Sequence, residues 1–137
     1  MILGVGVDLL GVARCERAAA EHGADFARAF CTPAELDACA ASREARREQA
    51  LRFAAKEALF KALALADRDG ATWREAEVES VATSPPRLRL HGRLAALARS
   101  RGVRRVHLAL TAAPGLAAAA VLLEGEPPES HPEETPR

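Results

Sequence analysis

The segment 52–63, Arg-Phe-Ala-Ala-Lys-Glu-Ala-Leu-Phe-Lys-Ala-Leu, predicts the middle of a long helix that is apolar on nearly all sides. A helix of this kind is normally buried, so the rest of the chain has to cover it. Glu57 and Lys61 are four residues apart and leave this helix on one face. Because buried charges need partners or a ligand to offset their desolvation, the two are either a simple helical ion pair or part of a binding site.

The composition indicates one domain that has no strong overall electrostatic field. The chain has 137 residues, with nineteen basic and nineteen acidic side chains and no tyrosine. A net charge of zero and few aromatic side chains do not favour nucleic acid or a membrane surface as a partner. Three cysteines lack metal-site spacing, and we see neither a signal peptide nor an apolar run of about 18 residues. We therefore expect free thiols and a cytoplasmic location.

The first ten residues predict a buried strand that carries one carboxylate. Gly4 and Gly6 lie at alternate positions, on one face of the strand, where another backbone or a ligand can come close. Asp8 is the only charged residue among the first thirteen. It is either a turn or capping residue or a functional carboxylate.

The remaining patterns predict an α+β fold in which helices pack on one side of an antiparallel sheet. We expect the domain to cover residues 1–124 and an acidic, Pro- and Glu-rich disordered tail to follow at 125–137. The expected helices are 12–22, 33–41, one from about 42 to 66, and 92–100; the expected later strands are 73–81, 88–90, 106–110 and 116–123.

Several charged residues outside the long helix have simple structural explanations. Thr32 and Glu35 predict a capping box, which suffices to explain Glu35. Arg14, Arg17 and Arg28 are either solvated surface residues or a short basic edge for an acidic partner. Lys56 is a weaker site candidate, since it points about 100° away from Glu57 on an ideal helix.

Asp8, Glu57 and Lys61 together suit chemistry at a pyrophosphate. Two carboxylates with open positions are typical of Mg²⁺, which keeps several waters and takes further ligands from substrate phosphates. Lys61 would add a positive point charge on the same phosphates. Spacing alone does not show that Asp8 and Glu57 meet in space.

A family resemblance adds to these residues. The segments Gly4-Val5-Gly6-Val7-Asp8 with Arg14, Thr-Pro-Ala-Glu at 32–35, and Arg-Phe-Ala-Ala-Lys-Glu-Ala at 52–58 with Lys-Ala-Leu at 61–63 resemble the holo-acyl-carrier-protein synthase family of phosphopantetheinyl transferases. The order and separations also match, and the similarity covers about residues 2–124. The chain departs from the family in the Gly-rich turn, replaced by 64–70, and in the late strand, where Ala109 and Ala112 replace a serine and a histidine.

The resemblance implies transfer of the 4′-phosphopantetheine arm of coenzyme A to a serine of an apo acyl carrier protein, in fatty acid or polyketide biosynthesis. It implies that Asp8 and Glu57 hold Mg²⁺, that Glu57 and Lys61 are catalytic, and that Lys61 binds the substrate phosphates. Arg14, Arg17 and Arg28 would then contact the carrier protein. The family's small members are homotrimers, so Asp8 and Glu57 are expected from neighbouring chains.

Two other functions remain open from the sequence. The departures from the family are compatible with a non-catalytic relative that binds a carrier protein or coenzyme A. They are also compatible with the same fold turned to another reaction on a carrier-bound substrate.

Overall fold

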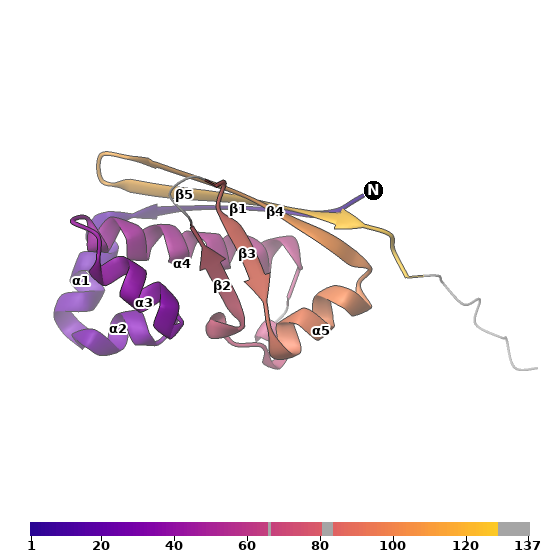
Figure 1. Ribbon diagram of the computed structural model, residues 1–137, viewed down its shortest axis with the longest axis horizontal. Coiled ribbons are helices and arrows are strands. Elements are labelled where there is room, and N and C mark those ends of the chain that lie inside the picture. Colours follow the sequence, from indigo (N-terminus) through magenta and orange to yellow (C-terminus); the bar gives the residue numbers. More distant parts are fainter. Residues whose placement is uncertain (66, 81–83, 129–137) are drawn as a thin grey trace, which may run out of the picture.

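The computed structural model describes residues 1–65, 67–80 and 84–128. A long helix, α4 (Ala45–Ala62), runs along one face of a three-stranded antiparallel sheet, and the other face of the sheet has no helix of the described residues on it (Figure 1). The sheet has the order β1-β5-β4, from strands β1 (Ile2–Gly11), β5 (Leu116–Gly125) and β4 (Val103–Ala113). The predicted α+β class, with helices on one side of an antiparallel sheet, is confirmed.

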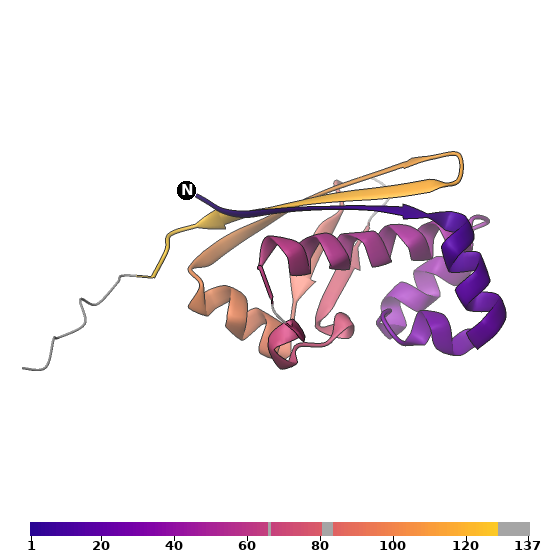
Figure 2. The ribbon, with the colours of Figure 1, turned by 180° about the vertical axis from the view of Figure 1, so that it is seen from behind.

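The smaller elements lie on the side of α4 away from the sheet (Figure 2). Helices α1 (Val12–His22), α2 (Ala24–Arg28) and α3 (Pro33–Ala40) gather near its beginning. Along its later part lie the short 3₁₀ turns Asp67–Gly70 and Trp73–Glu75, the hairpin of β2 (Ala76–Glu79) and β3 (Arg87–Leu90), and α5 (Gly92–Ser100).

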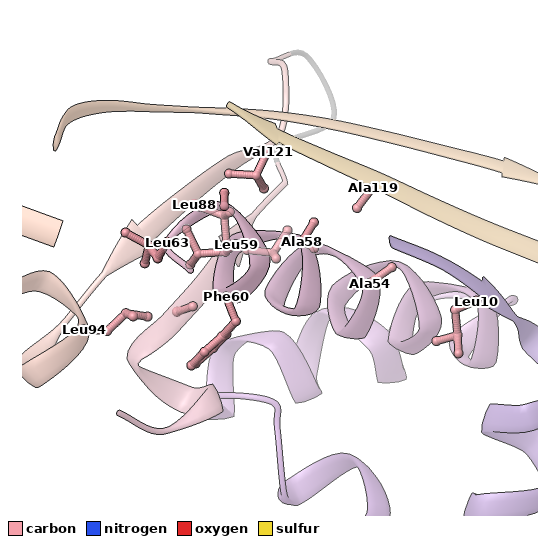
Figure 3. Close-up of a cluster of buried hydrophobic side chains, with 14 of the residues drawn as sticks. Leu10, Ala54, Ala58, Leu59, Phe60, Leu63, Leu88, Leu94, Ala119 and Val121 are labelled. Atoms are coloured by element: carbon pink, nitrogen blue, oxygen red, sulfur yellow. The ribbon is translucent and has the colours of Figure 1, made fainter. Parts of the chain in front are cut away.

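The core lies between α4 and the sheet and is closed below by the hairpin and α5 (Figure 3). Ala54 and Ala58 of α4 are fully buried, and the small side chains of β5, such as Ala119, face them. Small residues on both surfaces let the helix and sheet approach closely. Larger side chains, including Leu59 and Leu94, fill the wider space beyond the helix.

Two glycines of β1 make the closest contact between the sheet and α4. A Cβ added at Gly4 would lie 2.1 Å from the Ala62 carbonyl oxygen, and one added at Gly6 would lie 1.9 Å from the Ala58 carbonyl oxygen. The predicted close backbone approach is therefore confirmed, and its partner is the long helix. The strand runs antiparallel to α4, because the earlier glycine lies over the later helical turn.

Several element boundaries match the sequence prediction and others do not. Helices α1 and α5 have the expected bounds. The long helix ends at Ala62, four residues before the expected end near 66, and residues 73–75 form a 3₁₀ turn ahead of the shorter strand β2. Strand β5 extends through Gly125, and residues 129–137 of the expected tail lie outside the described residues. No helix in the described ranges has the length and apolarity to cross a bilayer.

Replacing Gly6 by alanine will destabilise the fold by about 1–3 kcal/mol, because the added methyl group collides with the backbone of α4 and forces β1 away from it. Gly11→Ala is the matched control: its added Cβ meets nothing within 4 Å, and its φ of −72° suits any residue. Its free energy of unfolding should stay within about 1 kcal/mol of wild type. Urea unfolding of the three proteins measures the difference, and equal losses for both variants would contradict this assignment.

Candidate active site

The structure brings Asp8 of β1 and Lys61 of α4 into direct contact. Lys61 Nζ lies 2.9 Å from Asp8 Oδ1 and donates a 3.1 Å hydrogen bond to the Val7 carbonyl oxygen. The Asp8 side chain is 15% exposed, whereas that of Lys61 is 52% exposed. The contact joins residues 53 positions apart in the sequence, and it lies at the solvent-facing edge of the helix–sheet junction.

Asp8 reaches this contact because it shares a strand face with Gly4 and Gly6. Successive side chains of a strand alternate, so positions 4, 6 and 8 point toward α4. The Cβ of Gly6 would meet Ala58, and Asp8 follows one pleat further along the helix. Asp8 therefore meets α4 of its own chain, and the expectation that Asp8 and Glu57 come from neighbouring chains stays a prediction.

Glu57 lies on α4 one turn before Lys61 and is half-buried. Residues four apart share a helix face, so its carboxylate belongs to the same edge of α4 as the Lys61 ammonium group. The face carrying Glu57 and Lys61 is more accessible than the sequence indicated, since Lys61 is exposed rather than enclosed. This exposure leaves the edge open to a ligand from solvent.

The donor set at this edge suits a hard cation with several waters. Asp8 and Glu57 offer carboxylate oxygens, the ligand type that Mg²⁺ prefers. Within the described ranges no three His, Cys, Asp or Glu side chains form a group that would hold a metal by themselves. The two carboxylates therefore fit a cation that takes its remaining ligands from water and substrate, and not a fully enclosed structural metal.

The turn that follows α4 has left-handed backbone at two residues that are not glycine. Ala64 has a φ of 47° and Asp69 a φ of 46°, a region that alanine rarely adopts, and Gly70 has a φ of 76°. Gly70 is the one glycine of the segment 64–70, which stands where the family has its Gly-rich turn. Arg101 Nη2 lies 3.3 Å from Asp69 Oδ2 and links this turn to the end of α5.

The three arginines proposed for a partner surface are all exposed. Arg14 and Arg17 lie three residues apart on α1. Arg28 lies at the end of α2, with its Nη1 3.7 Å from Asp25 Oδ1. Such an exposed pair is weak, so Arg28 remains available to another carboxylate.

The explanation of Glu35 as a capping residue was wrong for its side chain. Thr32 does cap α3, since its Oγ1 accepts a 3.3 Å hydrogen bond from the Glu35 backbone N–H. The Glu35 carboxylate instead turns inward: its Oε1 lies 2.9 Å from Lys56 Nζ and accepts a 3.1 Å hydrogen bond from the Val78 N–H. The buried lysine of α4 is therefore Lys56 and not Lys61.

A basic groove along the β4 edge was also missed from the sequence. It has a volume of about 590 Å³ and runs between the start of β3 and the middle of β4; Arg87 and Arg105 supply its cationic side chains, and His107 also lines it. His107 Nε2 lies 2.8 Å from Glu124 Oε2, and this hydrogen bond lowers the pKa of Glu124. Alternation along β4 gave no hint that these cations and the β3 segment share one groove.

Comparison with known proteins agrees with this architecture. Residues 4–113 match the family model of the 4′-phosphopantetheinyl transferase superfamily. A holo-[acyl-carrier-protein] synthase of Anaeromyxobacter dehalogenans is 46% identical over 132 residues, which cover 93% of this chain and 100% of that protein. The chain belongs to the holo-acyl-carrier-protein synthase family of this superfamily.

Solved structures extend the match to three dimensions. The holo-[acyl-carrier-protein] synthase of Neisseria meningitidis superposes with a TM-score of 0.84 at 29% identity, covering 90% of this chain and 99% of that chain. The coenzyme A complex of the Chronobacterium ammoniagenes enzyme superposes with a TM-score of 0.79 at 26% identity, covering 90% and 97%. One of these relatives was therefore solved with coenzyme A bound.

Proposed function

We propose that this protein transfers the 4′-phosphopantetheine group of coenzyme A to a serine of an apo acyl carrier protein, in a reaction that depends on Mg²⁺. The observation that carries the proposal is the Asp8–Lys61 contact, which joins the two segments that resemble the family at one accessible edge. A second carboxylate, Glu57, is one turn before Lys61 on α4, and its position on the same helix face supports the proposal.

Each residue of this edge has a distinct part in the reaction. Asp8 and Glu57 would hold Mg²⁺, which screens the negative charge of the pyrophosphate. Glu57, directly or through a water, accepts the proton of the attacking serine hydroxyl. The serine oxygen forms a bond to the phosphorus of the pantetheine phosphate, and the bond from that phosphorus to the bridging oxygen breaks. Adenosine 3′,5′-bisphosphate leaves with that oxygen.

Lys61 has the freedom to move from a protein partner to the substrate. Its side chain is 52% exposed, and it now bonds Asp8 and the Val7 carbonyl oxygen. With Asp8 as a ligand of the metal, the Lys61 ammonium group would be available to the departing phosphate and would offset its charge. The basic groove of Arg87, Arg105 and His107 offers a second cationic surface suited to the nucleotide end of coenzyme A.

Transfer is tested by the mass of several apo carrier proteins incubated with the protein, coenzyme A and Mg²⁺. We expect a gain of one phosphopantetheine on at least one carrier, loss of the gain with a chelator, and recovery when Mg²⁺ is restored. Asp8→Asn and Glu57→Gln should lower kcat/KM by roughly 10³-fold, since the loss of metal binding removes several kcal/mol of charge stabilisation. Lys61→Met should lower kcat on the order of 10²-fold.

The same experiment separates the alternative functions. Carrier or coenzyme A binding without a mass gain would contradict the transferase and favour a binding module. A change in an acyl group already on the pantetheine arm would favour another reaction on a carrier-bound substrate.

The carrier protein would bind to the surface of α1 and α2 that carries the exposed arginines. Arg14 and Arg17 of α1 and Arg28 of α2 supply exposed positive charge for an acidic helix. An apolar pocket of about 390 Å³ opens between α2 and α4, and Phe26, Phe30 and Phe53 contribute to its lining. Charge and an adjoining apolar pocket suit an acidic amphipathic helix of the carrier.

Reversing the charge of Arg14 or Arg17 should raise KM for the carrier by roughly tenfold, equivalent to about 1.4 kcal/mol, while kcat stays near wild type. Added salt should raise the wild-type KM and affect the Arg14→Glu variant less. Arg99→Glu, an exposed reversal on α5, is the matched control. Equal effects of all three reversals would show that the contact is not local.

A homotrimer would cover the face of the sheet opposite α4. Val5, Val7 and Leu9 of β1 project from this face and are 58%, 59% and 66% exposed. Alternate positions of β5 on the same face carry the small residues Ala118 and Ala120, which permit close approach of another sheet. A second and third copy are the occupants that this exposed apolar face and the family resemblance favour.

Val7→Asp should turn the trimer into monomers, because each interface would bury an unpaired carboxylate. Sedimentation or light scattering measures the mass, and Ala20→Asp on the exposed side of α1 is the control. A wild-type monomer would contradict the proposed assembly. We also propose a cytoplasmic location, which the three free cysteine thiols support.

A further inference from the structure

Among the described residues, one ion pair has both side chains almost completely buried, and its lysine is next to Glu57 in the sequence. Lys56 is 0% exposed and Glu35 is 1% exposed. Lys56 Nζ lies 2.9 Å from Glu35 Oε1 and also donates to the Phe30 carbonyl oxygen. Glu35 Oε1 accepts in addition from the Val78 N–H at 3.1 Å. The second carboxylate oxygen, Oε2, is buried with no hydrogen-bond partner among the described residues.

These bonds connect one side chain of α4 to three other segments. Phe30 belongs to the connection between α2 and α3, Glu35 to α3, and Val78 to β2. The pair therefore fastens α4 to the helical end of the molecule and to the hairpin at the same point.

Stability alone does not explain a pair in this place. Two charges removed from water lose hydration that their attraction often fails to restore, and apolar replacements of buried pairs are frequently neutral or stabilising. Burial raises the pKa of Glu35 and lowers the pKa of Lys56, so desolvation outweighs the attraction of the partners in both groups. The pair does provide hydrogen bonds of defined direction between α4 and the segments around it, which an apolar contact cannot provide.

The rotation of α4 about its axis matters because Glu57 directly follows Lys56 in the sequence. The two side chains leave the helix about 100° apart, so fixing the position of Lys56 also fixes the direction in which Glu57 points. On a helix about 10–12 Å across, a rotation of about 10° moves a side-chain tip by roughly 1 Å. Such a rotation would displace Glu57 and separate Lys61 from Asp8, and displacements of about 1 Å can lower rates on the order of 10²-fold.

We propose that Glu35 and Lys56 are positioning residues, which hold the rotation of α4 so that Glu57 and Lys61 face Asp8. The inference rests on the proposed transfer reaction for its catalytic consequence, whereas the position of Lys61 can be measured without any activity. Neither residue touches the substrate in this role.

Lysine labelling measures that position directly. The chain contains only two lysines, and Lys56 is inaccessible, so an amine-reactive reagent reports on Lys61 and on the N-terminus, which peptide mass spectrometry separates. Asp8→Asn, which removes the partner of Lys61, gives the rate for an unrestrained side chain. We use Glu35→Gln with Lys56→Met, because this neutral pair keeps the acceptor for Val78 and a side chain of similar length.

The double variant should fold with a Tm close to wild type, label Lys61 several-fold faster, and lose kcat on the order of 10²-fold with little change in KM for coenzyme A. Leu94→Ala is the matched control for a general loss of stability, because Leu94 is fully buried on α5, away from this pair. It should lower the Tm yet keep the wild-type labelling rate and kcat.

Each outcome decides the question. A folded double variant with wild-type labelling or wild-type kcat overturns the inference, and so does a Leu94→Ala variant with the same defects. If the double variant does not fold, Glu35→Gln alone is measured in the same way, and its failure to fold would show a purely structural pair. If wild type transfers nothing, the proposed function fails, while labelling still decides whether the pair positions Lys61.

Discussion

The contact between the backbone of β1 and the backbone of α4 is the constraint on which the rest of the structure depends. Gly4 and Gly6 have no side chains, so the strand lies directly on the carbonyl groups of Ala62 and Ala58. Asp8 is the next residue of β1 that points toward α4, and at this strand–helix separation the side chain of Lys61 reaches it, with its Nζ 2.9 Å from Asp8 Oδ1. A residue larger than glycine would both weaken the core and move the carboxylate away from α4. Fold stability and site geometry therefore share one cause.

The alanine-rich composition follows from the same contact. Ala54 and Ala58 of α4 and Ala117 and Ala119 of β5 are buried where helix and sheet meet. On the other side of the helix, α5 and the hairpin contribute larger apolar side chains such as Leu94 and Leu88. The high content of small residues thus reflects a short helix–sheet distance, and it accounts for a well-packed domain with few aromatic side chains.

The sequence predicts those parts of the molecule that depend on local periodicity, and it fails where distant segments decide. Capping and turn residues predict the bounds of α1 and α5, since Gly23 and Gly102 end these helices by their own conformational freedom. The resemblance singles out Asp8 and Lys61 as site residues, and the structure brings these two side chains into contact. Glu35 and Lys56 could not be paired from spacing, because their contact depends on how α3 packs against α4 and β2. The capping box also explained Glu35 from neighbouring residues alone, so it left no reason to look for its actual partner, Lys56.

The departures from the family pattern fall on different surfaces and therefore have different consequences. Through strand pairing, Asp8 is aligned with Ala119 and Ala119 with Leu110, so these three share the inner face of the sheet. Ala109, the neighbour of Leu110, consequently points to the opposite face, which is the face proposed to meet another copy. Ala112 returns to the inner face beyond the end of the core, beside a pocket of about 560 Å³ at the start of α1. Ala109 in place of the family's serine thus lies on the face proposed to meet another copy, and Ala112 in place of its histidine lines the pocket at the start of α1. Neither residue takes part in the contact between Asp8 and Lys61, so both substitutions leave the proposed site residues in place.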